Sequence, residues 1–287
     1  MLLKNRLILL ALIIAAAAVV LSFPSCQSMR EAPREPLPEP GQMPHPRNII
    51  IMIGDGMGFN HVDAASLYQY GETGRQAYEQ FPVRAAMSTY PASGAYNARR
   101  AARSHSYVKS GATDSAAAST ALACGHKTRN GHTGVDRRKK ALRNVVEVAE
   151  ASGRATGVVT TVPFSHATPA GFVAHSHSRE NYEEIAREML WQSGLDVMMG
   201  AGHPLYDNDG KEKAPKEKSY QYVGGRESWT SVTQAAAGGD ADGDGDADAW
   251  SLIETREAFQ SLASGETPAR LLGVARAYKT TQQCRSG

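Results

Sequence analysis

Residues 49–53 form a run of five apolar side chains, Ile-Ile-Ile-Met-Ile, which is followed at once by Gly-Asp-Gly. A short run with no polar position is typical of a strand buried on both faces of a parallel sheet. Such a strand needs neighbouring strands and two covering layers. The run therefore predicts an α/β domain that begins near Asn48.

After this first strand, the pattern of the sequence alternates between helices and strands. Residues 142–151 have helical periodicity, and residues 156–162 form a β-branched strand. A second helix is expected over residues 180–192, and a third strand over residues 195–199. This order predicts an α/β fold with a mostly parallel central sheet and helices on both faces. Chemistry in such sheets gathers where strands end, which marks the loops after Ile53, Val162 and Met199.

The first 47 residues have a different character. Lys4 and Arg6 precede an apolar run over residues 7–21, which is short for a membrane span and typical of a signal peptide, expected over residues 1–25. Either Cys26 is lipidated after cleavage, or the signal peptide is an ordinary one and the cysteine is incidental. Both alternatives predict that the protein is exported, either as a periplasmic protein or as a membrane-anchored lipoprotein. Residues 26–47 are proline-rich and predict an extended spacer.

Charge and cysteine content exclude few partners. The net charge of +2 gives no reason to expect nucleic acid binding. Export permits a disulfide between Cys124 and Cys284, although Cys124 lies in an alanine-rich segment where a small buried residue is expected.

A polar and acidic insertion is expected over about residues 207–250. Its aspartates alternate from Asp240 to Asp248, as in the first half of an EF-hand calcium loop. Ser251 stands at the twelfth position, where such a loop needs a bidentate carboxylate, so a flexible acidic segment is favoured over a calcium site.

Three short segments carry candidate chemistry. Asp55 follows the first apolar run between glycines, where its oxygens could reach a divalent metal, although such aspartates also occur in ordinary tight turns. Thr113 or Asp114 can cap a helix that places Ser115 in its first turn, where backbone N–H groups favour an anion. A serine there can act as a nucleophile, and it can equally be part of a simple cap.

The third segment follows the strand over residues 156–162. His166 and Thr168 could contact a metal or its bound waters, and the planar fork of Arg179 could hold two phosphate oxygens. Each of these residues also has common structural roles. The order in which the three segments occur is the more specific signal.

Asp-Gly-x-Gly after a strand, then TDSAA at residues 113–117, then HATPA at residues 166–170 with a downstream arginine, resembles the alkaline phosphatase family. The segments at residues 130–136 and 270–275 are also similar to that family. The resemblance runs from about residue 48 to the end of the chain, apart from the acidic insertion. Phosphodiesterases and sulfatases of related fold have other nucleophile motifs, which argues against those activities.

The resemblance implies a role for each matching residue. Ser115 would be the nucleophile that becomes phosphorylated, Arg179 would bind the phosphate, and Asp114 would orient Arg179. Asp55 would bridge a zinc ion and the magnesium ion, and Thr168 would lie on the magnesium ion. His166 would lie at the third metal site. His175 and His177 fall outside the family's ligand positions and are expected to be structural.

The resemblance also implies two Zn²⁺ ions, one Mg²⁺ ion and hydrolysis of small phosphate monoesters through a phosphoserine. Members of the family are often dimers, so a homodimer is one expectation. The remaining metal ligands of the family come from a C-terminal portion that the sequence does not contain, and His203 is the sole histidine after Arg179. The fold is therefore expected to be incomplete. The alternative function is a non-catalytic exported lipoprotein that binds phosphate or calcium.

Overall fold

The computed structural model describes residues 46–234, 248–265 and 267–282. It divides into two compact units, Met1–Ile53 and Gly54–Gly287, and every helix and strand below lies in the second unit. The helices are α2 (Phe59–Tyr70), η1 (Ala77–Gln80), α3 (Ala98–Ala101), α4 (His105–Gly111), α5 (Ser115–Cys124), α6 (Val145–Glu150), α7 (Ala167–Ala170), α8 (Tyr182–Trp191), η2 (Glu217–Val223), α9 (Arg226–Thr233) and α10 (Arg256–Ser261). The strands are β1 (Gly157–Pro163), β2 (Val197–Ala201), β3 (Ser251–Ile253) and β4 (Leu271–Val274).

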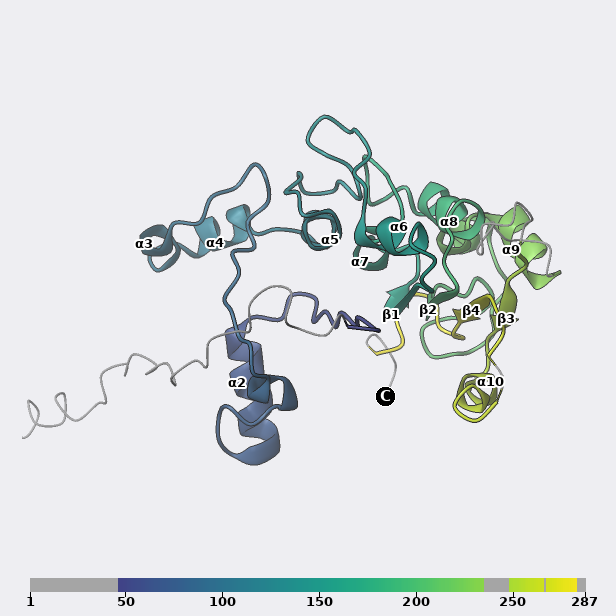
Figure 1. Ribbon diagram of the computed structural model, residues 1–287, viewed down its shortest axis with the longest axis horizontal. Coiled ribbons are helices and arrows are strands. Elements are labelled where there is room, and N and C mark those ends of the chain that lie inside the picture. Colours follow the sequence, from purple (N-terminus) through teal and green to yellow (C-terminus); the bar gives the residue numbers. More distant parts are fainter. Residues whose placement is uncertain (1–45, 235–247, 266, 283–287) are drawn as a thin grey trace, which may run out of the picture. The chain divides into compact units, whose positions relative to one another are not determined.

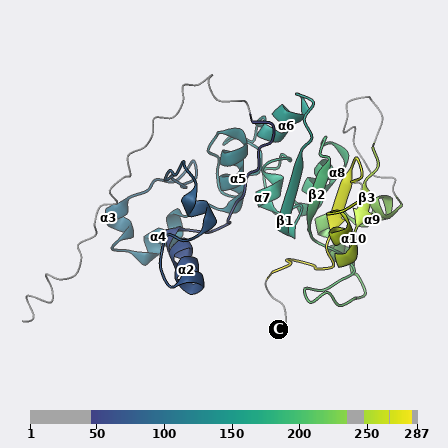
Figure 2. The same ribbon diagram turned by 60° about the horizontal axis from the view of Figure 1, so that its bottom comes forward.

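These strands form one parallel sheet in the order β1-β2-β4-β3. Val197 lies between Gly157 on β1 and Leu271 on β4, so the three strands are paired in register (Figure 2). All four residues of β4 are buried, as expected for a central strand. The prediction of an α/β fold with a parallel sheet is confirmed.

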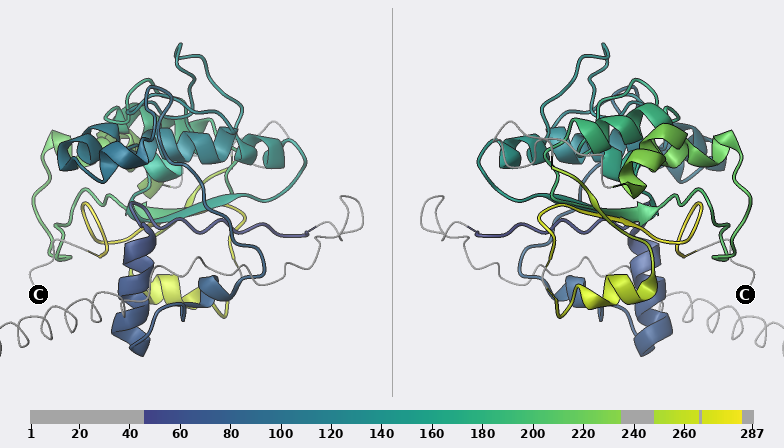
Figure 3. Two further views of the ribbon diagram at one scale, coloured as in Figure 1. Left: turned by 90° about the vertical axis from the view of Figure 1, so that its left-hand side faces the viewer. Right: turned by 90° about the vertical axis from the view of Figure 1, so that its right-hand side faces the viewer.

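Helices cover both faces of this sheet. Figures 1 and 3 show α6, α7, α8 and α9 on one face and α10 on the other. Helix α8 buries Ile185, Ala186, Met189 and Leu190 along one side, because these positions recur with the helical period. Trp250 then donates its indole N–H to the Leu190 carbonyl at 3.1 Å, which links the start of β3 to α8.

The strand expected over residues 49–53 does not form in this structure. The backbone there has no regular secondary structure, and Ile49, Ile50 and Met52 are 76%, 85% and 91% exposed. An all-apolar run becomes a buried strand only where neighbouring strands pair with it and two layers cover it. The described residues supply no such pairing, so the prediction for this element is wrong here.

The segment expected to be a polar insertion also differs in part. Helices η2 and α9 lie within it, and Tyr220, Val223, Trp229 and Val232 join the main hydrophobic core. The aromatic residues are spaced too widely among polar ones to give a strong sequence signal. Most of the candidate calcium loop, residues 240–247, lies outside the described residues.

Several other predictions also fall outside the described residues. These concern the signal peptide over residues 1–25, Cys26, most of the spacer, and Cys284. Cys124 is a free, half-buried thiol, and burial raises its pKa to about 11. Within the part of the chain that is described, no helix has the length and apolar content needed to span a bilayer.

Candidate active site

Two hydroxyl side chains meet at the carboxylate of Asp55. Ser115 donates its hydroxyl proton to Asp55 Oδ2 at 2.8 Å, and Thr168 donates to the same oxygen at 3.0 Å. Asp55 lies in a tight turn in which Met57 N–H donates to the Gly54 carbonyl and Gly56 has a φ of 69°. The sequence suggested these residues separately, and the structure brings them together.

Ser115 owes its position to the cap of helix α5. Asp114 is the N-cap residue, and its Oδ1 accepts a hydrogen bond from Ala117 N–H at 2.9 Å. The backbone N–H of Asp114 in turn donates to the side chain of Asn130 at 3.1 Å. Ser115 is therefore the first residue of the helix, where the helix dipole and first-turn N–H groups favour a bound anion.

Close packing of α5 against α7 places Thr168 beside Ser115. Ser119, in the second turn of α5, donates to the Ala167 carbonyl at 2.9 Å. An ideal Cβ at Gly171 would lie 2.0 Å from Ser119 Oγ, so the approach needs a residue without a side chain. Ser119 and Ala167 are buried at 1% and 0% exposure, which makes this contact a fixed part of the core.

Asp114 has a second partner in Arg179. Arg179 Nη1 donates to Asp114 Oδ2 at 3.2 Å, and their side chains are 19% and 24% exposed. Gly131 N–H donates to the same carboxylate oxygen at 2.8 Å, and Arg179 N–H donates to the Gly131 carbonyl at 2.7 Å. Asp114 thus contacts the guanidinium of Arg179, and its role in orienting that group stays a prediction.

His166 lies next to Arg179 and makes no described hydrogen bond to Asp55. Its Nε2 is 3.2 Å from Arg179 Nη2, and its ring stacks near Tyr182 with centroids 6.4 Å apart. Burial lowers the pKa of His166, and the positive charge of Arg179 lowers it further. Its Nδ1 is buried with no hydrogen-bond partner in the described structure.

The other histidines after Thr168 do not join this cluster. His175 bonds to Glu188 through Nδ1 at 2.9 Å and to the Leu142 carbonyl through Nε2 at 3.0 Å, as befits a structural residue. His177 is exposed. His203 is buried against Tyr206 and Trp229 and bonds to Glu254, so both its nitrogens are engaged within the core.

The cluster fits part of a metal site. Asp55, Ser115 and Thr168 offer one carboxylate and two hydroxyl oxygens, a donor set that suits Mg²⁺. Zinc is bound mostly through histidine and cysteine, with three or four protein ligands. Within the described residues, no group of three or more His, Cys, Asp or Glu side chains is spaced to hold a metal ion.

Two residues support the site without having been assigned a role from the sequence. Asn130 accepts from Asp114 N–H and donates its amide to the Ala112 carbonyl at 3.0 Å, and Gly131 joins Asp114 to Arg179. The similarity of residues 130–136 to the family is the signal that could have identified their contribution.

Comparison with known proteins gives a consistent result. The family model for alkaline phosphatase matches residues 46–282. Alkaline phosphatase 4 of Bacillus subtilis is 36% identical over 188 residues, covering 62% of this chain and 38% of that protein. The alkaline phosphatase of Escherichia coli is 33% identical over 217 residues, covering 66% of this chain and 44% of that protein.

Solved structures agree with these relatives. The cold-active alkaline phosphatase of the psychrophile Shewanella sp. matches with a TM-score of 0.57 and 27% identity, over 81% of this chain and 48% of that chain. The alkaline phosphatase of the Antarctic bacterium TAB5 matches with a TM-score of 0.51 and 25% identity, over 79% and 53% of the two chains. This chain therefore spans less than half of the length of the two curated relatives named above.

Proposed function

Because this chain belongs to the alkaline phosphatase family, we propose that it carries the nucleophile and the phosphate-binding arginine of a phosphate monoester hydrolase. The observation that carries the proposal is the shared acceptor. Ser115 and Thr168, 53 positions apart in the sequence, both donate to Oδ2 of Asp55 within 3.0 Å.

Ser115 Oγ attacks the phosphorus atom in this proposal, and the bond between phosphorus and the ester oxygen breaks. Asp55, which already accepts the hydroxyl hydrogen bond at 2.8 Å, takes the serine proton, and the leaving oxygen takes a proton from water. The first turn of α5 favours the negative charge of the phosphate through its dipole. Water then attacks the phosphoserine and releases inorganic phosphate.

Arg179 binds and orients the phosphate. Its guanidinium has five N–H donors. Nη1 faces Asp114, and Nη2 faces His166. The donors that remain can hold two non-bridging oxygens in a fork, which aligns the ester with Ser115. Asp114 keeps the guanidinium from rotating away.

Metal ions complete the proposed site, with two Zn²⁺ and one Mg²⁺ expected from the family. Asp55 and Thr168 would hold the magnesium ion, Asp55 and Ser115 would contact one zinc ion, and His166 would line the third site. Bound divalent ions lower the pKa of coordinated oxygen nucleophiles and neutralise charge on the transferring phosphoryl group. Among the described residues nothing completes either zinc site.

One observation favours a second function. Because the described residues hold no complete metal-ligand group, an exported protein that binds phosphate without turnover is the alternative. Export itself, a lipid anchor on Cys26 and a homodimer all remain proposals. They rest on the sequence of residues 1–26 and on the family.

Hydrolysis of an aryl phosphate tests the function. The 287-residue chain is assayed at about pH 9 with zinc and magnesium, beside Ser115→Ala and the control Ser110→Ala, whose exposed hydroxyl lies on α4. We expect turnover and a phosphoserine in the wild type and in Ser110→Ala. Folded protein that binds phosphate but never turns over would favour the alternative, and retained activity in Ser115→Ala would refute the assigned nucleophile.

A further inference from the structure

A hairpin rich in positive charge projects from the segment that joins α5 to α6. Val135 and Ala141 form an antiparallel bridge, and the tip between them carries Arg137, Arg138, Lys139 and Lys140 in succession. We call residues 135–141 the cationic hairpin. All four cations are exposed, and no ion pair within the described residues involves them.

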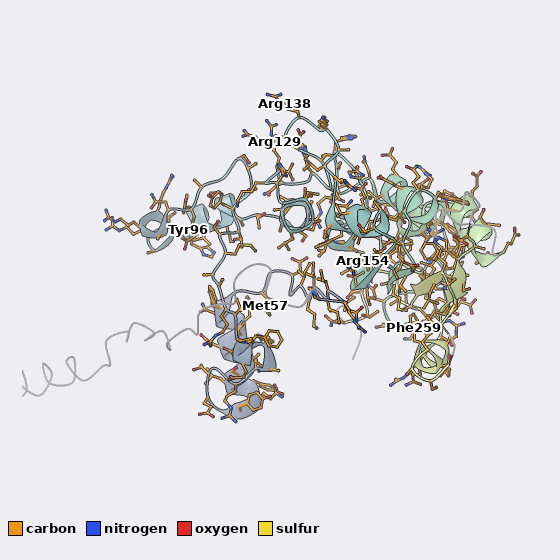
Figure 4. The ribbon with its side chains drawn as sticks, in the orientation of Figure 1. Met57, Tyr96, Arg129, Arg138, Arg154 and Phe259 are labelled. Atoms are coloured by element: carbon orange, nitrogen blue, oxygen red, sulfur yellow. The ribbon has the colours of Figure 1, made fainter. Side chains whose placement is uncertain are left out.

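Further cations flank this hairpin. From residue 125 to residue 144 the chain has seven lysine or arginine residues and Asp136 as its one acidic residue. Figure 4 shows Arg138 at the end of the projecting loop and Arg129 lower on the same side of the ribbon. Lys127, Arg129 and Arg143 are exposed as well. The protein as a whole carries a net charge of only +2, so this concentration is local.

Asp136 shapes the turn and offsets one of the four positive charges. Its Oδ1 accepts the backbone N–H of Arg138 at 2.7 Å and of Lys140 at 2.9 Å. The hydrogen bond from Lys140 is the main cause that lowers the pKa of Asp136, with the one from Arg138 and the charges of both side chains adding to it. The carboxylate thus stays ionised in its structural role, and the hairpin, with four cations and one carboxylate, keeps a net charge of +3.

Lys139 occupies a left-handed backbone conformation, which a lysine adopts at a cost in free energy. Its φ is 67°, and among the described residues it alone, apart from glycines, has a positive φ. A lysine in this left-handed region costs about 1 kcal/mol relative to glycine. Glycine or asparagine would make an easier turn, and either would remove one of the four charges.

The base of the hairpin is fastened to the candidate site. Gly131 binds the Asp114 carboxylate and the Arg179 backbone, and Thr133 pairs with Ser176 through hydrogen bonds of 2.9 and 2.8 Å. At Gly134 a Cβ would lie 2.1 Å from the Ala174 carbonyl oxygen, so the segment packs against the chain that leads to Arg179. These contacts join the residues that lead into the hairpin to Asp114 and to the segment before Arg179.

Resting on the proposed function, we propose that the cationic hairpin selects phosphate monoesters that carry negative charge beyond the scissile phosphate. Arg137 follows Gly131 by about six positions, so the tip lies at most about 20 Å of extended chain from the Asp114 contact. The Debye length is about 8 Å at physiological ionic strength and about 30 Å at 0.01 M, so at low salt the hairpin acts on the approach of substrate and on its distal anionic groups. It leaves the chemical step at Ser115 unchanged.

Two substrates with related leaving groups test this proposal. Phenyl phosphate is compared with a phenyl phosphate that bears two ring carboxylates, at about 20 mM and about 200 mM salt. The variant Arg137→Gln/Arg138→Gln/Lys139→Gln/Lys140→Gln removes the four charges. The control Lys211→Gln/Lys216→Gln/Lys218→Gln/Lys279→Gln removes four exposed cations elsewhere.

At low salt we expect the hairpin variant to lose about tenfold in kcat/KM for the dicarboxylate, with kcat unchanged. The loss for phenyl phosphate should be about twofold, and the control should match the wild type. The advantage of the wild type should shrink at high salt. Equal losses for both substrates, or equal losses in the control, would overturn the proposal.

A binding measurement separates this proposal from the proposed function. If no protein turns over either substrate, the catalytic proposal fails, and calorimetric titration with tripolyphosphate and with orthophosphate tests the hairpin alone. Weaker tripolyphosphate binding in the hairpin variant at low salt supports selection of extended anions. Binding equal to that of the wild type refutes it. Matching thermal unfolding midpoints show that the variant is folded.

Discussion

At the residue scale, Asp114 combines two duties on its two carboxylate oxygens. Oδ1 caps helix α5 through Ala117 N–H, and Oδ2 holds Gly131 N–H and Arg179 Nη1. A helix cap contributes about 1 kcal/mol to stability. The other oxygen forms the ion pair with Arg179. A substitution that removes the charge but keeps an acceptor oxygen can therefore separate the cap from the ion pair.

We predict that Asp114→Asn keeps most of the cap and loses the electrostatic support of Arg179. The thermal midpoint should fall only slightly, while phosphate binds about tenfold more weakly, which corresponds to about 1.4 kcal/mol. Asp114→Ala should lose both properties. Calorimetric phosphate titration beside a thermal melt measures each; equal phosphate affinity in Asp114→Asn and the wild type would contradict the prediction.

His175 gives a second prediction at this scale, for stability against pH. The hydrogen bond to Glu188 is the main cause that raises the pKa of His175, despite burial, which lowers it. A raised pKa in the folded state means that the contribution is fully present below the unfolded pKa of about 6.5. It is lost as pH rises through the folded value.

The variant His175→Gln should therefore be less stable than the wild type by on the order of 1 kcal/mol near pH 5.5. The difference should be smaller at about pH 8.5. Urea unfolding at both pH values measures it, with His177→Gln, an exposed neighbour, as the control. A difference that grows with pH would show that the sign is wrong.

At the element scale, the site depends on the seam between α5 and α7. Helix α5 carries Ser115, and α7 carries Thr168. The hydrogen bond from Ser119 to Ala167 and the lack of a side chain at Gly171 bring the two helices together. The distance between Ser115 and Thr168 is therefore set by core packing and not by surface contacts.

Gly171→Ala should push these helices apart. We expect a loss of about 1–3 kcal/mol in stability, typical of overpacking, together with weaker phosphate binding. Gly111→Ala is the matched control, since an added Cβ there meets nothing within 4 Å. Chemical denaturation of both variants checks the prediction, and equal stability of the two would contradict it.

Sequence patterns located several of these elements and failed at others for physical reasons. The strand expected over residues 156–162 appears as β1, and the helix over residues 180–192 appears as α8, because local periodicity reports one buried face. The run over residues 49–53 failed because its structure depends on partners that local pattern cannot supply. The meeting of Ser115 with Asp55 and Thr168 is a product of tertiary packing, and the family resemblance was the signal that implied it.

At the scale of the whole molecule, a buried arginine ties the sheet together. Arg270, 2% exposed, lies just before β4 and donates to the carbonyls of Leu195, Asp248 and Ser193. Its guanidinium also lies 4.2 Å from the ring centroid of Trp250. One side chain thus joins segments next to β2, β3 and β4.

Arg270→Ala should destabilise the whole sheet, because it leaves buried carbonyls without donors and opens a cavity. We expect a loss of about 3–5 kcal/mol in a single cooperative transition. Arg256→Ala, an exposed change at the start of α10, should cost less than about 0.5 kcal/mol. Differential scanning calorimetry distinguishes the two, and similar midpoints would refute the assigned role.

The contact between Asp55, Ser115 and Thr168 can form only after all three residues have been synthesised. Asp55 precedes Ser115 by 60 residues and Thr168 by 113. At the usual speed of translation the last of these residues emerges on the order of ten seconds after the first. In a chain exported during synthesis, as proposed above, the aspartate would cross the membrane before the hydroxyls that it is to meet. The cluster would then assemble only after Thr168 has followed.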